Sequence, residues 1–215
     1  MELQSRKKKR TKTKATISNT GQRAIIIFIR VPELGKVKTR LAKEVGEEKA
    51  LKIYKALLSH TREVSLNTNA SRYLYYATSP VKDEWDEDQF IKSSQKGEGL
   101  GERMMSAFQE VLTQCQQVLI IGSDCPQLSS KIIEEAFEKL ENSDVVIGPT
   151  MDGGYYLLGL KEMYPFLFEN MEWSTENVNK ETIKRSKENG LSIYELDILS
   201  DVDYKEDWDK YGWEI

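Results

Sequence analysis

Continuous apolar runs of strand length are the feature that most constrains how this chain can fold. The clearest is AIIIFIRV at residues 24 to 31, and QVLIIGS at 117 to 123 and DVVIGP at 144 to 149 repeat it. A strand that is apolar on both faces must be covered on both faces, as in a parallel sheet between two layers of helices. Stretches with helical spacing alternate with these runs, for example at residues 50 to 58 and 130 to 141. We therefore predict an α/β fold in three layers, Rossmann-like, with a mostly parallel sheet.

The remaining elements continue the same alternation. Further strands are predicted at residues 72 to 78, 90 to 94, 154 to 160 and 192 to 197, and further helices at about 100 to 114, 176 to 189 and 204 to 211. A chain of 215 residues with 39% hydrophobic residues fits one globular domain and leaves little room for two. We assign residues 24 to 215 to that domain.

Residues 1 to 23 have a different composition. They carry eight basic residues and one acidic residue, a net charge of +7. Because the whole chain has a net charge of −4, the rest of the chain carries −11. A block of like charge without hydrophobic periodicity is typical of a disordered tail. Such a tail is either a solvated extension or a contact for a polyanion, which would be RNA or an anionic membrane surface.

Several function classes are disfavoured by composition. The single histidine, His60, lies in a strongly helical pattern, which nearly excludes catalytic triads and metal sites built on imidazole. The two cysteines, Cys115 and Cys125, form neither a disulfide framework nor a Cys-x-x-Cys pair. The chain also lacks an apolar stretch near the roughly 18 residues of a membrane span, and its N-terminus lacks the apolar segment of a secretory signal. We expect a cytoplasmic protein.

A basic loop follows the first predicted strand. In PELGKVKTRLA, Lys36, Lys38 and Arg40 are the cations, Gly35 gives the backbone freedom, and Thr39 offers a hydroxyl near the start of the next helix. Ligands of open α/β sheets bind beyond the carboxyl ends of the strands, and cations there suit an oligophosphate. The alternative is a solvated basic loop. The spacing of a Walker A loop is absent.

A second loop, QKGEGLGERMM, is rich in glycine. Gly99 and Gly101 would allow the backbone to approach a nucleotide closely, and Arg103 could reach a phosphate or a carboxylate. A flexible loop in front of a helix explains the same pattern.

Lone aspartates follow two other predicted strands. Asp124 ends the buried run in IIGSDCP, and Asp201 and Asp203 follow the last strand in ILSDVDYKEDW. Carboxylates at the end of a central strand are suitable ligands for a hard cation such as Mg²⁺. The alternative is that these residues cap the following loops or helices.

The stretch GPTMDGGYYLLGL raises two hypotheses for Asp152, Gly153 and Gly154. In the first, these residues form an ordinary turn between two strands, for which Asp-Gly is a common signal. In the second, the glycines keep side chains out of a cleft so that a substrate can lie against the backbone, and Asp152 binds hydroxyls or acts as a base. Downstream, EWST gives further candidate contacts or a helix cap: Trp173, Ser174 and Thr175.

Six motifs in order give the chain a family resemblance from about residue 24 to 209: PELGKVKTRLA, GEGLGERM, IGSDCPQL, DGGYYLLGL, EWST and DVDYKEDW. The sequence resembles the radical-SAM/selenodomain-associated transferase 1 family, whose members have the GT-A fold of nucleotide-diphospho-sugar transferases. That family in turn resembles the guanylyltransferase of coenzyme F420 synthesis and the molybdenum-cofactor nucleotidyltransferases, which share the basic loop and the Asp-x-Pro strand end. At Ser123-Asp124-Cys125 the chain lacks the Asp-x-Asp that is typical of GT-A glycosyltransferases, and it is nearer there to the nucleotidyltransferases.

The resemblance implies roles for individual residues. Lys36, Lys38 and Arg40 would hold phosphates, with both lysines stabilising charge in the reaction. Asp124 would bind Mg²⁺, or Mn²⁺ in its place, with Asp201 or Asp203 as the second ligand. The residues implied on the nucleotide side are Gly99, Gly101 and Arg103, and those facing the donor sugar or the acceptor are Asp152, Gly153 and Tyr155.

Three functions are compatible with these residues. The first is metal-dependent glycosyl transfer from a nucleotide sugar to a small-molecule acceptor, with Asp152 as the base; we favour it on the family naming. The second is nucleotidyl transfer from a nucleoside triphosphate to a phosphorylated small molecule, with release of pyrophosphate. The third is a nucleotide- or RNA-binding domain without activity.

Overall fold

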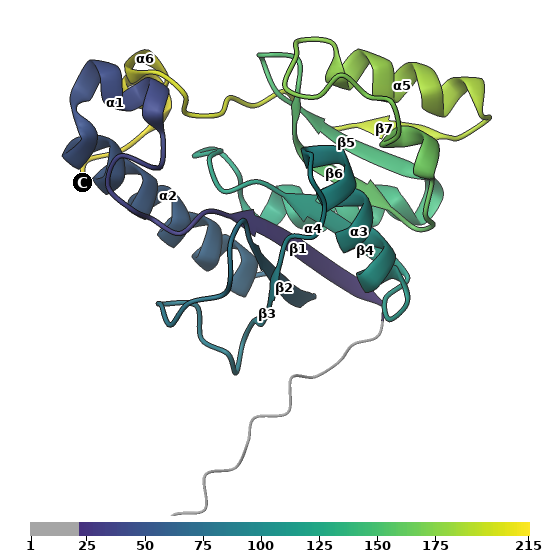
Figure 1. The fold of residues 1–215 in the computed structure, drawn as a ribbon. Coiled ribbons are helices and arrows are strands. Elements are labelled where there is room, and N and C mark those ends of the chain that lie inside the picture. The colour runs from purple at the N-terminus through teal and green to yellow at the C-terminus, as the bar shows by residue number, and fades with distance from the viewer. Residues whose placement is uncertain (1–21) are drawn as a thin grey trace, which may run out of the picture.

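The structure, a computed structural model, describes residues 22–215 (Figure 1). The predicted basic tail therefore lies outside the described residues, except for Gln22 and Arg23, and Arg23 is already the first residue of a strand. Between residues 22 and 215, none of the helices combines the length and the apolarity needed to cross a membrane.

The sheet has seven strands, and six of them run in the same direction. In chain order the strands are β1 (Arg23–Ile29), β2 (Ser71–Tyr76), β3 (Ile91–Ser94), β4 (Gln117–Ile121), β5 (Val145–Pro149), β6 (Tyr155–Leu160) and β7 (Ile193–Glu195). Their spatial order is β3-β2-β1-β4-β6-β5-β7, and only β6 runs antiparallel to its neighbours, β4 and β5. The prediction of an α/β fold with a mostly parallel sheet is confirmed.

Helices cover both faces of this sheet, which gives the three predicted layers (Figure 1). The helices are α1 (Thr39–Val45), α2 (Glu47–Leu66), α3 (Leu100–Leu112), α4 (Ser130–Asn142), α5 (Val178–Glu188) and α6 (Lys205–Tyr211), with a short 3₁₀ helix at Pro165–Leu167. On one face, Ile25 and Ile27 of β1 belong to the same buried cluster as Phe137 of α4. On the other face, Ile26 belongs to a cluster with Phe108 of α3. Successive residues of β1 thus point to opposite layers, as the apolar run requires.

A third, smaller cluster joins the helices at the carboxyl edge of the sheet. Leu41 of α1, Leu57 of α2 and Trp208 of α6 are buried together with Val202, which precedes α6. Burying side chains of this size stabilises the fold by about 1.5–3 kcal/mol each. This cluster holds the basic loop and the C-terminal segment against α2, although they lie more than 150 residues apart in the sequence.

The strand order reverses at β1. The chain runs outward from β1 through β2 to β3 and then returns to the other side of β1 as β4. Loops that follow two neighbouring strands on either side of such a switch point diverge and leave a crevice, which is where ligands bind in open α/β sheets. The basic loop follows β1, and Asp124 follows β4.

The Asp-Gly-Gly stretch forms the turn of the β5–β6 hairpin, as the first of the two hypotheses for it predicts. The N–H of Gly153 donates to the carbonyl of Thr150 at 3.1 Å, and Asp152 accepts from the Thr150 hydroxyl at 2.6 Å and from the Gly154 N–H at 3.1 Å. Gly153 has a φ of +88°, and a Cβ there would lie 2.1 Å from the carbonyl oxygen of Glu176. Gly153 is required by this turn and by its close approach to the protein's own backbone at Glu176.

A stability measurement separates these two requirements. Gly190, after α5, also has a positive φ (+73°), but a Cβ there would meet nothing within 4 Å. We expect Gly190→Ala to lower the free energy of unfolding by about 1 kcal/mol, because only the backbone conformation is disfavoured. Gly153→Ala should cost about 1–3 kcal/mol more, because the clash with Glu176 adds to it. Equal losses for the two variants in urea unfolding would show that the contact with Glu176 is relieved without cost.

Candidate functional site

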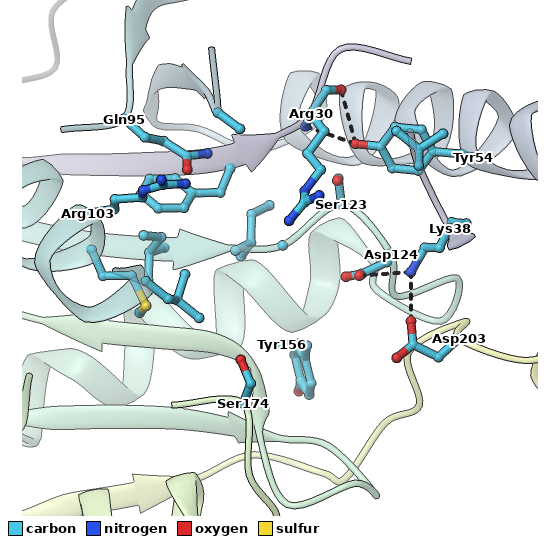
Figure 2. A pocket seen from close by; sticks show the side chains of 18 of the residues that line it. Arg30, Lys38, Tyr54, Gln95, Arg103, Ser123, Asp124, Tyr156, Ser174 and Asp203 are labelled. Carbon is cyan, nitrogen blue, oxygen red and sulfur yellow. Dashed lines mark hydrogen bonds and ion pairs between the residues drawn. The ribbon is translucent and has the colours of Figure 1, made fainter. Parts of the chain in front are cut away.

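A cleft of about 630 Å³ lies at the carboxyl ends of β1 to β4, at the point where the strand order reverses (Figure 2). Its size is in the range of roughly 300–1,000 Å³ that is typical of small-molecule sites. Nine of the site residues predicted from the sequence line it: Lys36, Lys38, Thr39, Arg40, Arg103, Asp124, Tyr155, Ser174 and Asp203.

Lys38 is at the centre of the polar contacts in this cleft. Its ammonium donates to Oδ2 of Asp124 at 3.0 Å and to Oδ1 of Asp203 at 3.3 Å, and only 7% of its side chain is exposed (Figure 2). Arg40 donates to the other oxygen of Asp203 at 2.9 Å. Lys38 has a left-handed backbone, with φ 46° and ψ 47°, which is uncommon for a residue with a side chain. Residues from three distant segments thus meet around one buried cation.

The charge of Lys38 is maintained by these carboxylates. Burial lowers the pKa of Lys38, but the negative charges of Asp124 and Asp203 more than offset burial, and the pKa is raised above its ordinary value. Lys38 is therefore protonated throughout the neutral range. A buried ammonium of this kind can neutralise the charge of a phosphate that displaces one of its carboxylate partners.

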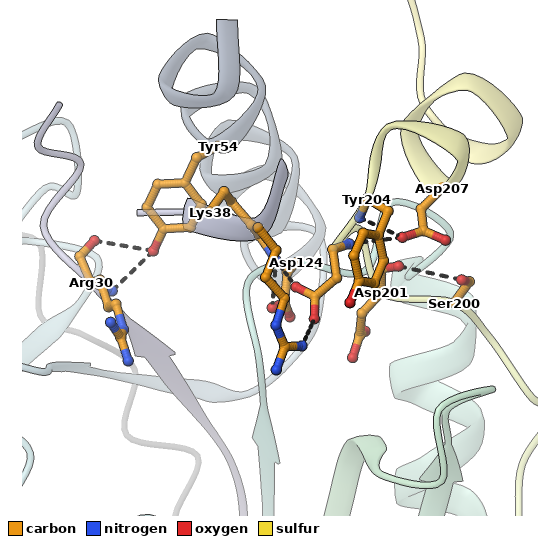
Figure 3. A network of polar contacts seen from close by, with 10 residues as sticks. Arg30, Lys38, Tyr54, Asp124, Ser200, Asp201, Tyr204 and Asp207 are labelled. Carbon is orange, nitrogen blue, oxygen red and sulfur yellow. Dashed lines mark hydrogen bonds and ion pairs between the residues drawn. The ribbon is translucent and has the colours of Figure 1, made fainter. Parts of the chain in front are cut away.

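Asp201 is the carboxylate in this network that has a buried oxygen without a hydrogen-bond partner among the described residues. Figure 3 shows the network, from Arg30 and Tyr54 on one side to Asp201 and Asp207 on the other. The buried oxygen of Asp201 is Oδ1. Burial and the nearby charge of Asp124 raise the pKa of Asp201 well above its ordinary value. An N–H···O bond of 3.0 Å from the Val202 backbone to the Asp124 carbonyl holds the two segments side by side.

This arrangement fits the predicted cation but does not yet form its site. Within residues 22–215 no three His, Cys, Asp or Glu side chains are grouped as a metal site, and Lys38 lies between Asp124 and Asp203. The orphaned oxygen of Asp201 beside Asp124 is the feature that fits a divalent cation, since a buried carboxylate oxygen is costly without a partner.

The alternative interpretation of these aspartates as helix caps is wrong for Asp124 and Asp203. The carboxylate of Asp207 accepts from the N–H groups of Asp203 and Tyr204, at 2.9 and 2.8 Å, at the start of α6. The N-cap of α4 is Ser129, whose hydroxyl accepts from the N–H of Ile132 at 3.3 Å. The side chains of Asp124 and Asp203 are bound to Lys38 instead.

Other predicted residues lie outside the cleft. Asp152 and Asp201 line a second hollow of about 550 Å³, which shares Arg40 and Asp203 with the cleft. One oxygen of Asp152 already accepts two hydrogen bonds within the hairpin turn. The cleft lining also omits Gly35, Gly153, Gly154 and Thr175. The hydroxyl of Thr175 is used locally, donating to the Glu172 carbonyl at 3.0 Å.

The structure separates the predicted nucleotide contacts of the glycine-rich loop. Gly99, Gly101 and Trp173 line a separate hollow of about 590 Å³, and Arg103 alone of the predicted nucleotide-side residues reaches the cleft. A Cβ on Gly101 would lie 2.2 Å from Nε1 of Trp173, so this glycine makes room for the indole rather than for a ligand. Trp173 itself stacks on Phe168, with ring centroids 6.3 Å apart, and is not part of the cleft lining.

The cleft contains residues that the motif search missed. The hydroxyl of Tyr54 accepts from the Arg30 N–H at 3.0 Å and donates to the Arg30 carbonyl at 3.1 Å, which fixes the chain where it leaves β1. Tyr54 matched the apolar spacing of α2 and was indistinguishable from a core residue. Gln95 follows the short strand β3 and opens the glycine-rich stretch QKGEGLGERMM, in which only Gly99, Gly101 and Arg103 stood out as candidates. The lining residues missed in this way include Arg30, Tyr54, Gln95, Ser123 and Tyr156.

The fold and the cleft together define an α/β protein of the nucleotide-diphospho-sugar transferase type. A crystal structure from Desulfovibrio desulfuricans G20, provisionally named a nucleotide-diphospho-sugar transferase, matches with a TM-score of 0.77 and 30% sequence identity, covering 85% of this chain and 82% of that one. The chain belongs to the DUF2064 family, described as uncharacterized proteins conserved in bacteria, whose family model matches residues 60–175.

Two further proteins are less similar to this chain. The 2-phospho-L-lactate guanylyltransferase of Methanocaldococcus jannaschii is 29% identical over 141 residues, which cover 63% of this chain and 59% of that enzyme. The chain thus spans less than two thirds of the relative's length. A protein of Mycobacterium tuberculosis H37Rv, solved in complex with manganese, has a TM-score of 0.53 at 12% identity, covering 88% of this chain and 97% of that one. This last likeness concerns the fold alone.

The pKa of Asp201 leads to a test by pH. A raised pKa in the folded state means that the stability contributed by the protonated carboxyl is present below the ordinary pKa of 3.8 and is lost as the pH rises through the folded pKa. In the presence of EDTA, Asp201→Asn should therefore unfold at a higher urea concentration than the wild type at pH 7. The difference should shrink towards acidic pH and disappear below the ordinary pKa. An Asp201→Asn variant that is less stable than the wild type at pH 7 would contradict the conclusion that burying the charged Asp201 carboxylate destabilises the fold.

Proposed function

We propose that this chain is a nucleotidyltransferase that joins a nucleoside triphosphate to a phosphorylated small molecule and releases pyrophosphate. The observation that carries the proposal is the buried Lys38, held between Asp124 and Asp203 at one end of a cleft of nucleotide size. Cations and paired carboxylates at a switch point are the groups that a metal-bound triphosphate requires.

Each group has a role in this reaction. Lys36, Lys38 and Arg40 bind the phosphates and stabilise the charge that develops as the bond between the α-phosphorus and the bridging oxygen breaks. The acceptor's phosphate oxygen attacks the α-phosphorus, and pyrophosphate leaves. Asp124 and Asp201, with Asp203, would hold a divalent cation of the Mg²⁺ or Mn²⁺ type. Such an ion, when bound, neutralises the phosphate oxygens.

Sequence likeness supports nucleotidyl transfer with GTP as the donor. The curated relative with 29% identity is a guanylyltransferase that is named for a phosphorylated acceptor. The chain has Ser-Asp-Cys at residues 123–125, where glycosyltransferases of the GT-A fold typically carry Asp-x-Asp. This preference replaces glycosyl transfer, which the family naming alone had favoured.

Glycosyl transfer remains the second candidate function. It is favoured by the Desulfovibrio structure, which is named for nucleotide-diphospho-sugar transfer and matches most of this chain. The six motifs further support placing the chain among the radical-SAM/selenodomain-associated transferases 1 within its family. The same cleft would then bind a nucleotide sugar and release a nucleoside diphosphate.

Nucleotide binding to Asp124→Asn tests the site. We expect GTP with Mg²⁺ to raise the melting temperature of the wild type, and the Mg²⁺-dependent affinity to fall on the order of 10- to 100-fold in the variant, because an amide is a weak ligand for a hard cation. Asp88→Asn is the matched control, since Asp88 is exposed on the loop before β3, and it should behave as the wild type. Unchanged Mg²⁺-linked binding in Asp124→Asn would overturn the site.

The released product then separates the two candidate functions. Incubation with GTP, Mg²⁺ and phosphorylated hydroxy acids should release pyrophosphate in step with consumption of GTP. Release of a nucleoside diphosphate from a nucleotide sugar, with no pyrophosphate from any triphosphate, would replace the first candidate by the second.

A further inference from the structure

The cleft has two chemically different ends. Lys38, Asp124 and Asp203 lie at one end, and Gln95 and Arg103 lie at the other (Figure 2). A nucleotide whose phosphates are bound by Lys38 would therefore place its base beside Gln95. The lining also includes the apolar side chains of Met104, which follows Arg103 in α3, and of Phe28, whose ring lies 5.9 Å from that of Tyr75; such side chains suit the faces of a planar ring.

The hydrogen bonds of Gln95 fix the orientation of its carboxamide. Its nitrogen faces two backbone carbonyls, that of Tyr75 in β2 at 3.1 Å and that of Ile29 at the end of β1 at 3.5 Å. The reverse orientation would place the amide oxygen against two carbonyl oxygens, which is repulsive. The oxygen must therefore point away from both strands, and Figure 2 shows it turned towards the side chains that line the cavity. Gln95 thus presents a fixed acceptor to the cleft.

Arg103 complements this acceptor with a donor. Its Nε donates to the carbonyl of Gly97 at 3.0 Å and its Nη2 to that of Glu98 at 3.4 Å. These bonds hold the guanidinium against the loop before α3, and among the described residues they leave Nη1 available. One end of the cleft therefore offers a fixed hydrogen-bond acceptor and a held donor, and apolar side chains line the space beside them.

We propose that Gln95 selects the base of the nucleotide, and that its Oε1 accepts hydrogen bonds from N1–H and the 2-amino group of guanine. This inference rests on the proposed nucleotidyl transfer from GTP. Guanine presents two adjacent donors, N1–H and the 2-amino group, on one edge, with the O6 acceptor next to them. The two donors match the fixed oxygen of Gln95, and O6 matches the guanidinium of Arg103. Gln95 is a specificity-determining residue in this proposal and takes no part in bond making.

A purely structural role for Gln95 predicts a different result. If the amide only connects β3 to the ends of β2 and β1, its loss would weaken the binding of all nucleotides alike. If it reads the base, its loss would affect only nucleotides that carry the donors it accepts from. Inosine triphosphate lacks the 2-amino group of GTP and is otherwise the same molecule, so the ratio of the two affinities reports on the acceptor directly.

The experiment is calorimetric titration of the full chain with GTP and inosine triphosphate in the presence of Mg²⁺, and with tripolyphosphate as a probe of the phosphate end. We expect the wild type to bind GTP about tenfold more tightly than inosine triphosphate, which corresponds to one hydrogen bond. In Gln95→Met the ratio should fall to about one, with tripolyphosphate affinity unchanged. Gln89→Met is the matched control, since Gln89 is an exposed glutamine on the preceding loop, and it should keep the wild-type ratio.

Each other outcome overturns the proposal. A wild type that binds the two nucleotides equally, or that prefers another base, excludes guanine recognition by Gln95, and this comparison needs no variant to fold. A ratio that stays near ten in Gln95→Met, or in Gln95→Asn, assigns the discrimination to another residue while the proposed function stands. If tripolyphosphate and every triphosphate fail to bind the wild type, the proposed function fails as well.

Discussion

The site depends on one buried cation and its two carboxylate partners. Lys38 comes from the loop after β1, Asp124 from the loop after β4, and Asp203 from the segment before α6, so a single ammonium connects three parts of the chain. A buried charge that loses a partner is strongly destabilised, and each of the three residues therefore depends on the others. The cluster of Leu41, Leu57 and Trp208 makes this meeting possible, because it holds α1 and α6 on α2.

The strands could be predicted from the sequence because a strand buried on both faces is a continuous apolar run, which can be recognised without knowing its neighbours in the sheet. The position of β6 could not be predicted. The hairpin hypothesis for Asp152 and Gly153 implied its antiparallel pairing with β5, but its place beside β4 follows from long-range pairing that leaves no local signal. Periodicity describes which faces are buried, whereas strand order depends on contacts between distant residues.

The site shows the same limit. Lys38, Asp124 and Asp203 could be predicted because charged residues just after apolar runs must lie at the carboxyl edge of the sheet. The surroundings of Gly101 and Gly153 could not be predicted, because the sequence does not distinguish a glycine that makes room for a ligand from one that makes room for Trp173 or for the backbone of Glu176. Tyr54 and Gln95 were missed because their roles come from hydrogen bonds to backbone carbonyls that are distant in sequence, which no local pattern records.

At Lys38, the left-handed backbone conformation lowers the stability of the fold, whereas the side chain is needed for the proposed binding. A side chain in this conformation costs about 1–2 kcal/mol relative to glycine, which would relax there. A search for more stable variants would therefore be drawn to glycine or asparagine at residue 38, and would remove the ammonium on which the cleft depends. Robustness to heat and the capacity to bind phosphate are thus opposed at this residue, and stabilising the protein without loss of binding requires changes elsewhere.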